Sequence, residues 1–332
     1  MDKDHPKVKF GKTGVLIINL GTPDSTNWWD IRKYLKEFLS DRRVIEVNPI
    51  IWQLILNVFI LTFRPSKTAH AYKKIWRKET NESPLLYFTR EQSKKLNNKI
   101  GNDKTIIDFA MRYGNPSISS RLTKLKEEGC ENIIILPLYP QYAAATTATV
   151  CDEVYRSLMR MRWQPSLQII PHYESEPLYI NALVKSIEKK INEISWKPDL
   201  IISSYHGIPK SYFDKGDPYQ CYCQKTSRLI REKFSDIEIK TTFQSRFGPQ
   251  EWLTPYTDKT LKTLPEKGIK NLLVICPGFA SDCVETLEEI NIQGRESFME
   301  HGGKNFDLIP CLNDSPDHID LFSHLVKKYI LK

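Results

Sequence analysis

One histidine stands where a buried strand of the sequence ends. Residues 199–202 form a short apolar run, and in residues 203–209 His206 comes just before Gly207 and Pro209. Such a run is typical of a parallel strand covered on both faces, and Gly and Pro mark the loop after it. In open α/β sheets, ligands bind beyond the carboxyl ends of the strands. His206 could therefore act as a base or a metal ligand, although a histidine bonded to a loop carbonyl would occupy the same position.

Carboxylates follow a second strand pattern. The apolar run 272–275 leads into a segment with Asp282, Glu285 and Glu289. In an α-helix these positions, i, i+3 and i+7, share one face. Capping and the helix dipole explain acidic residues in a first turn, which accounts for Asp282 more readily than for Glu289. Together with His206, this row predicts a site that binds a divalent cation or moves protons.

The motifs that precede and follow the strands occur twice, in the same order. Each half holds a strand ending in Gly-x-Pro, then an Arg-aromatic-Gly motif, then a Gly and an Asn ahead of an apolar run; the pairs begin at residues 21 and 207, 112 and 246, and 129 and 268. Three echoes in one order favour an internal duplication. We expect an α/β protein with two similar Rossmann-like domains, parallel sheets flanked by helices, and the active-site cleft between the domains.

The domain boundaries follow from these repeats. We expect a first domain over residues 1–170 and a second over 171–310, which carries His206 and Glu285. A C-terminal helix within 311–332 would pack back on the first domain. Between the matched motifs the first half is about 52 residues longer, which indicates an insertion over about residues 25–80.

The insertion contains the apolar lip, residues 50–63. At this length, and interrupted by Gln53 and Asn57, it is too short to span a bilayer, which needs about 20 apolar residues. A helix apolar on nearly every face is usually core; the alternative is an exposed surface for a flat apolar ligand or a membrane. Basic side chains follow the lip at Arg64, Lys67, Lys73, Lys74, Arg77 and Lys78.

Composition restricts the class of protein. The 332 residues are 40% hydrophobic and 27% charged, which suits a globular protein, and the net charge of +8 comes from dispersed lysines. No nucleic-acid motif is evident. Seven scattered cysteines, without a signal peptide, favour a reducing cytoplasm over a disulfide framework. Cys221 and Cys223 lack the partner pair that a zinc or iron–sulfur site needs.

The chain resembles the ferrochelatases, which insert ferrous iron into a porphyrin. The resemblance runs from residues 16–23 to the C-terminal helix, and residues 204–209 and 281–289 are its most specific parts. It implies that His206 and Glu285 take part in metal binding and pyrrole deprotonation. It further implies a proton or metal relay at Asp282 and Glu289, and porphyrin-binding positions at Leu20, Arg64, Ser83, Arg112, Tyr113, Tyr142 and Phe243.

The chain departs from some family members at four points. Cys283 replaces a histidine two residues before the glutamate, and Phe243 replaces a tryptophan. Leu20 occupies the position of a Tyr or Met on the opposite porphyrin face and cannot ligate iron. The C-terminal cysteine cluster that holds [2Fe–2S] in some members is missing, since Cys311 is the last cysteine. We therefore expect no cluster and no permanently bound cofactor.

The resemblance implies insertion of Fe²⁺ into protoporphyrin IX, the last step of haem biosynthesis. We expect a cytoplasmic monomer or homodimer, with peripheral association at the inner face of the cell membrane through residues 50–63, and no nucleic-acid partner. The alternatives are a coproporphyrin III ferrochelatase, another tetrapyrrole chelatase acting on sirohydrochlorin or cobalt, a non-catalytic porphyrin carrier, and a membrane-surface adaptor. A substrate with many carboxylates would not require the apolar lip.

Overall fold

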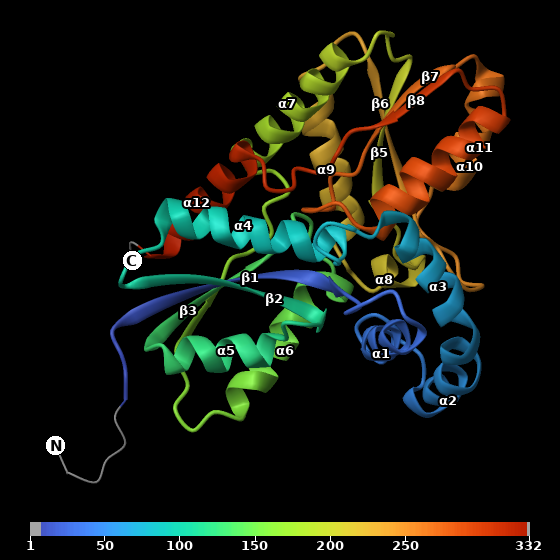
Figure 1. The fold of residues 1–332 in the computed structure, drawn as a ribbon. Coiled ribbons are helices and arrows are strands. Elements are labelled where there is room, and N and C mark those ends of the chain that lie inside the picture. Colours follow the sequence, from blue (N-terminus) through green and yellow to red (C-terminus); the bar gives the residue numbers. More distant parts are fainter. Residues whose placement is uncertain (1–7, 331–332) are drawn as a thin grey trace, which may run out of the picture.

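Two four-stranded parallel sheets form the frame of the computed structural model, which describes residues 8–330 (Figure 1). Their strand orders are β2-β1-β3-β4 and β6-β5-β7-β8, so the second sheet repeats the topology of the first. The predicted fold class, two similar α/β units, is therefore confirmed. The strands are β1 (Lys12–Thr22), β2 (Thr105–Gly114), β3 (Cys130–Pro137), β4 (Ser166–Ile169), β5 (Leu200–His206), β6 (Glu238–Gln244), β7 (Asn271–Ile275) and β8 (Asn305–Leu308).

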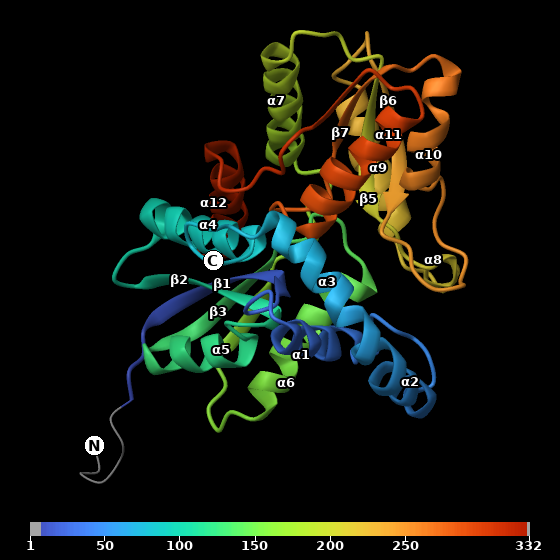
Figure 2. The same cartoon turned by 45° about the vertical axis from the view of Figure 1, so that its right-hand side comes forward.

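Helices flank both sheets (Figure 2). Around the first sheet lie α1 (Trp28–Leu39), α2 (Pro49–Ile55), α3 (Leu61–Ile75), α4 (Pro84–Ile100), α5 (Ile118–Glu127) and α6 (Thr149–Met159), with π-helical turns η1 (Leu56–Ile60) and η2 (Ala144–Ala148). Around the second lie α7 (Pro177–Glu193), α8 (Lys210–Asp214), α9 (Tyr219–Arg231), α10 (Thr257–Thr263), the 3₁₀ turn η3 (Pro265–Lys267), the π-helix η4 (Glu285–Gly294) and α11 (Arg295–Glu300), and α12 (Pro316–Ile330) ends the chain.

The inner strands of the sheets consist mainly of apolar residues, because both of their faces are buried. In β1, Ile17 is fully buried and pairs with Phe109 of β2 on one side and Leu136 of β3 on the other. Strands buried on both faces read as continuous runs of branched residues, as β1 does. This arrangement holds the carboxyl ends of the strands at one edge of each sheet, where the loops with polar side chains begin.

The two units share one continuous core. A single cluster of buried side chains includes Ile17 and Ile134 of the first sheet and Ile201 and Leu273 of the second. Helix α12 contributes Phe322 to it and contacts both α4 and α7. The boundaries at residues 170 and 310 remain predictions.

The apolar lip is exposed. Residues Pro49–Ile75 form one helical stretch of 27 residues, interrupted only by the π-helical turn η1, and side chains such as Ile50 and Phe63 are 83% and 73% exposed. Only a minority of its side chains, including Leu56 and Leu61, are buried in the molecule. By length and composition the whole helical stretch could cross a membrane, because the helix continues beyond residue 63, whereas the apolar run 50–63 alone is shorter than a span.

Candidate active site

His206 is the last residue of β5 and lies beside Gln244 in the register of the sheet. Its Nδ1 donates a hydrogen bond to the Gly207 carbonyl at 2.6 Å. The loop-carbonyl interaction considered from the sequence is therefore present, but it engages only one ring nitrogen. It fixes the proton on Nδ1 and leaves Nε2 as a lone-pair acceptor. Nε2 has no hydrogen-bond partner among residues 8–330.

Glu285 begins a π-helix, η4, instead of lying within an α-helix. Asp282 precedes this helix, and its carboxylate accepts hydrogen bonds from Asn313 Nδ2 at 2.7 Å and Thr286 Oγ1 at 3.1 Å. The predicted single face with three carboxylates was therefore wrong, because only Glu285 and Glu289 belong to the helix and its winding is not α-helical. Asp282 anchors the start of η4.

The acidity of Glu289 is affected by the charges of His206 and Glu285. Burial raises the pKa of Glu289, hydrogen bonds from Ser245 and the charge of His206 lower it, and the charge of Glu285 raises it. The Ser245 backbone N–H donates to Oε1 at 2.7 Å, and the Ser245 hydroxyl donates to Oε2. Gln244 Nε2 donates to the Glu285 carbonyl at 2.9 Å. The ends of β5 and β6 and the start of η4 therefore meet at one point.

A narrow pocket opens beside Glu285. Its volume of about 10 Å³ is on the order of one water molecule. Leu20 and Ser83 line it, and Ser83 also caps α4 by accepting a hydrogen bond from the Leu86 N–H at 3.2 Å. The full lining is Leu20, Gly21, Tyr34, Tyr72, Ile75, Ser83, Pro84, Leu85, Cys283, Val284 and Glu285.

Helix α3 approaches the segment after β6. The Arg64 guanidinium lies 5.4 Å from the centre of the Phe247 ring, two residues beyond Ser245. Phe247 in turn packs on Trp252, with ring centroids 5.0 Å apart. Phe243 does not line this region, because it is 1% exposed and packs in a separate core cluster with Tyr205.

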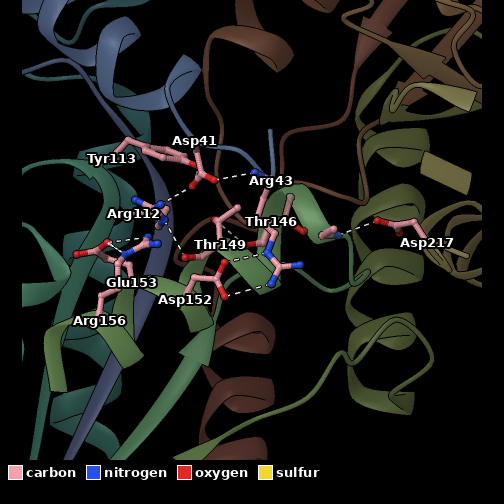
Figure 3. A network of polar contacts seen from close by, with 11 residues as sticks. Asp41, Arg43, Arg112, Tyr113, Thr146, Thr149, Asp152, Glu153, Arg156 and Asp217 are labelled. Atoms are coloured by element: carbon pink, nitrogen blue, oxygen red, sulfur yellow. Dashed lines mark hydrogen bonds and ion pairs between the residues drawn. The ribbon is translucent and has the colours of Figure 1, made fainter. Parts of the chain in front are cut away.

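Arg112 and Tyr113 lie in a different polar network (Figure 3). The Arg112 guanidinium forms an ion pair with Asp41 and donates to the Thr149 carbonyl at 2.9 Å, and the Tyr113 hydroxyl donates to Asp41 at 2.9 Å. Arg112 lines a polar cleft of about 1110 Å³ that does not include Glu285. Tyr142 is half-buried, and burial and the nearby Asp217 carboxylate raise its pKa.

Two residues that hold η4 had no signal in the sequence. Gln92 of α4, fully buried, donates from Nε2 to the Ala280 carbonyl at 3.1 Å and to the Asn313 carbonyl at 2.9 Å. Asn313 Oδ1 accepts from the Asp282 N–H at 2.8 Å. These contacts join the first unit to the acidic segment across 188 and 221 positions of sequence, which no local spacing reveals.

Comparison with known proteins identifies the family. The family model described as ferrochelatase matches residues 12–330. A curated ferrochelatase of Rhizobium meliloti strain 1021 is 53% identical, covering 98% of this chain and 97% of the relative. That of Brucella ovis is 50% identical, covering 98% and 94%. The chain belongs to the ferrochelatase family.

The solved structures show the same fold in other chelatases. SirB from Bacillus subtilis, solved with Fe³⁺, superposes with a TM-score of 0.56 at 13% identity, over 96% of this chain and 95% of that one. A sirohydrochlorin chelatase SirB in complex with cobalt, from subspecies spizizenii, gives the same TM-score at 10% identity. At these identities the likeness concerns the fold alone.

Membership of the ferrochelatase family defines the reaction class. The chain is a metal chelatase of the lyase class in haem biosynthesis, with a porphyrin and a metal ion as substrates. Among residues 8–330, no group of three or more His, Cys, Asp or Glu side chains is arranged to hold a metal ion.

Proposed function

We propose that this ferrochelatase inserts Fe²⁺ into protoporphyrin IX to give protohaem, with the ring held between the α2–α3 stretch and the ends of β5 and η4. The observation that carries the proposal is that the ends of β5 and β6, with His206 and Gln244 in register, are bonded to the helix of Glu285 and Glu289, whose Glu285 lines a pocket shared with the first unit. In this conformation the pocket is too small for a porphyrin. The ring would enter as α3 and the segment at Phe247 separate, breaking the contact between Arg64 and Phe247.

Metal insertion requires two pyrrole N–H protons to leave. His206 accepts them one at a time at Nε2, because its Nδ1 proton is held by the Gly207 carbonyl, and Nε2 must pass the first proton on before it accepts the second. Glu289, whose buried carboxylate has a raised pKa, takes the proton onward. Glu285, at the pocket wall, and Nε2 of His206 bind the incoming iron first, and Nε2 becomes free to accept protons once the iron has passed to the ring. Leu20 offers no ligand on the opposite side.

The porphyrin must also be distorted, because a planar ring hides its nitrogen lone pairs. Binding that favours a buckled ring contributes about 1–5 kcal/mol to the lowering of the barrier. Leu20, Tyr34 and Tyr72 form a wall facing Glu285 in the pocket. This wall would press one side of the ring while the proton acceptors lie on the other.

The apolar lip favours protoporphyrin IX over the four-carboxylate coproporphyrin III. Residues 50–63 contain no charged side chain, and seven large apolar side chains from Ile50 to Phe63 are exposed. A vinyl-edge contact of about 100 Å² would contribute about 2.5 kcal/mol at roughly 25 cal/mol per Å². Two further propionates at that edge would lose hydration without a cation beside them. Arg64 and Lys67, both exposed, follow the lip and suit the two propionates that protoporphyrin carries.

Comparing kcat/KM for the two porphyrins at equal Fe²⁺ tests this choice of substrate. We expect kcat/KM to be at least about tenfold higher for protoporphyrin IX. This factor is smaller than the one that corresponds to the full apolar contact of about 2.5 kcal/mol. A preference for coproporphyrin III would contradict the role given to the lip and would assign the enzyme to the alternative reaction.

We also propose that the enzyme holds no [2Fe–2S] cluster. The two cysteines closest in the sequence are Cys221, which is exposed, and Cys223, which is buried on the same helix. Protein purified without oxygen should lack iron–sulfur absorbance and labile sulfide. Two iron and two sulfide per chain would contradict the proposal and would point to this cysteine pair.

We place the enzyme in the cytoplasm as a monomer or homodimer, associated peripherally with the inner face of the cell membrane. The support for membrane association is the exposed apolar lip followed by basic side chains, a combination that suits an anionic bilayer surface. Co-sedimentation with vesicles tests it, and loss of binding on replacing Ile51 and Leu54 by serine is the expected result. Full binding by that variant would contradict it.

A further inference from the structure

Helix α6 and the turn after it expose a second set of large apolar side chains. Tyr155, Met159 and Trp163 are 48%, 79% and 40% exposed. They recur every four residues, which places Tyr155 and Met159 on one face of the helix and Trp163 just beyond its end. The adjacent face, about 100° around the helix, holds Val154 and Leu158, which are buried in the core of the first sheet. The exposed face is therefore not needed to fold the helix.

Arginines accompany these apolar side chains. Arg160 and Arg162 are exposed, and neither lies in an ion pair within the described part of the chain. Arg156 on the same helix is paired with Glu153 at 2.9 Å. Aromatic rings beside unpaired arginines are typical of segments that lie in the interface of an anionic bilayer, where the ring sits at headgroup level and each cation gains from the surface potential.

The α6 segment lies on the same side of the molecule as the apolar lip. Pro49, the first residue of α2, and Arg156 of α6 line the same polar cleft. Arg43, from the segment before α2, is bonded to Asp152 of α6 at 2.8 Å. In Figures 1 and 2, α2 and the turn after α6 both reach the lower edge of the molecule. A flat surface at this edge would meet both segments.

We propose that residues 155–163 form a second contact with an anionic lipid bilayer, beside that of the apolar lip. The inference rests on the membrane association proposed above for residues 50–63. One contact alone leaves the protein free to rotate about α2, whereas two contacts fix its orientation on the surface. The lip would enter the apolar layer, and Trp163 with Arg160 and Arg162 would bind at the headgroups.

Vesicle co-sedimentation of the full chain tests this inference. Vesicles of phosphatidylcholine with roughly 30% phosphatidylserine, which have an anionic surface, are compared with vesicles of phosphatidylcholine alone. The test variant is Arg160→Gln/Arg162→Gln. The matched control is Lys262→Gln/Lys267→Gln, an exposed basic pair at the opposite end of the molecule. At roughly fivefold per arginine near such a surface, the test variant should bind anionic vesicles at least about tenfold more weakly, and the control should bind like the wild type.

Two further measurements separate the explanations. Porphyrin metallation in detergent should be unchanged in Arg160→Gln/Arg162→Gln, because neither arginine lies at the active site. Wild-type affinity of that variant for anionic vesicles would overturn the second contact while leaving the lip and the reaction intact. Sedimentation velocity showing a wild-type dimer that the variant loses would assign this face to a second copy of the chain, and would equally overturn it.

Discussion

Glu289 is a carboxylate whose acidity is set by its neighbours. Burial raises its pKa, and the two hydrogen bonds from Ser245 act in the opposite direction because they favour the ionised form. Ser245 adopts a positive φ of 65°, a left-handed conformation that is uncommon for residues other than glycine. This backbone geometry accompanies the donation of both its N–H and its hydroxyl to one carboxylate.

Replacing Ser245 by alanine should shift the pH dependence of insertion. The loss of the hydroxyl removes an interaction that lowers the pKa of Glu289, so that pKa rises further. Glu289 must be ionised to take a proton. As the solution is acidified, the kcat of the variant will therefore begin to fall at a higher pH than the kcat of the wild type. We expect the acid limb of the pH–rate profile to move up by about one unit or less.

Glu289→Gln provides the control for that shift. This variant cannot ionise at position 289, so adding Ser245→Ala to it should leave the acid limb where it is. The single Glu289→Gln change should lower kcat by roughly tenfold or more, since a step of proton transfer is lost. If Ser245→Ala shifts the acid limb equally in the wild type and in Glu289→Gln, then Glu289 is not the group being titrated.

At the scale of elements, tertiary hydrogen bonds hold η4 in its π-helical form. Gln244 and Ser245 of the β6 end bind Glu285 and Glu289, and Lys74 of α3 forms an ion pair with Glu288 at 3.0 Å. The sequence predicted an α-helix here because residue spacing carries no sign of these partners. The strand ends and the acidic types were predictable, but the winding of the helix depends on contacts from distant segments.

Asn313→Ala should misplace the start of η4. The change removes two hydrogen bonds to Asp282 and leaves part of a buried carboxylate without a donor. We expect a loss of about 1–3 kcal/mol in the free energy of unfolding, and a lower kcat with little change in the KM for porphyrin. Urea unfolding and steady-state kinetics measure both.

Asn305→Ala is the matched control, since Asn305 makes a side-chain bond of 2.8 Å to Asn271 at the far end of the second sheet. Its kcat should stay normal even if its stability falls. Equal losses of kcat in both variants would mean that Asn313 affects only stability.

His318 makes the docking of α12 sensitive to acid. It is fully buried, donates from Nδ1 to the Asn313 carbonyl at 2.7 Å and packs on Phe322. Burial lowers the pKa of His318 to about 4, below its usual value of about 6.5. The unfolded chain therefore binds a proton more readily than the folded one below pH 6.5. The contribution of His318 to the free energy of unfolding is fully present above pH 6.5 and is lost as the pH falls towards 4.

His318→Gln should flatten that dependence. In the wild type we expect about 3 kcal/mol of unfolding free energy to be lost between pH 6.5 and 4 through this group. The glutamine variant lacks this titration. The difference in unfolding free energy between the wild type and the variant should therefore shrink as the pH falls. Urea unfolding at four pH values measures it, and parallel curves for the two proteins would contradict the assignment.

At the scale of the whole molecule, the repeated motifs predicted the repeated sheets. The echoes at residues 21 and 207, 112 and 246, and 129 and 268 correspond to two sheets with the same strand order. The strand β8 gave no such signal, because it lies at a sheet edge and mixes polar with apolar residues. Edge strands need less apolar surface than inner strands such as β1 and β5.

Composition also left the position of the apolar lip open. A core helix and an exposed lip have the same apolar content, and only the packing of α2 and α3 shows that Ile50 and Phe63 face outward. Likewise, family resemblance grouped Arg112 and Tyr113 with the porphyrin site, and the structure shows both side chains bonded to Asp41, with Arg112 lining a cleft that does not include Glu285. Long-range contacts decide such placements, and they cannot be inferred from single positions.

The central claim is that the second unit performs the chemistry on a porphyrin held mainly by the first. Zinc insertion into protoporphyrin and the Kd for protoporphyrin, measured side by side for the wild type, His206→Ala and His301→Ala, test it most directly. His301 is an exposed histidine at the end of α11, remote from the pocket, and serves as the control. We predict that His206→Ala lowers insertion at least about a hundredfold, as expected for loss of a general base, with Kd within roughly threefold of the wild type, and that His301→Ala changes neither. Near-normal insertion by His206→Ala would contradict the account.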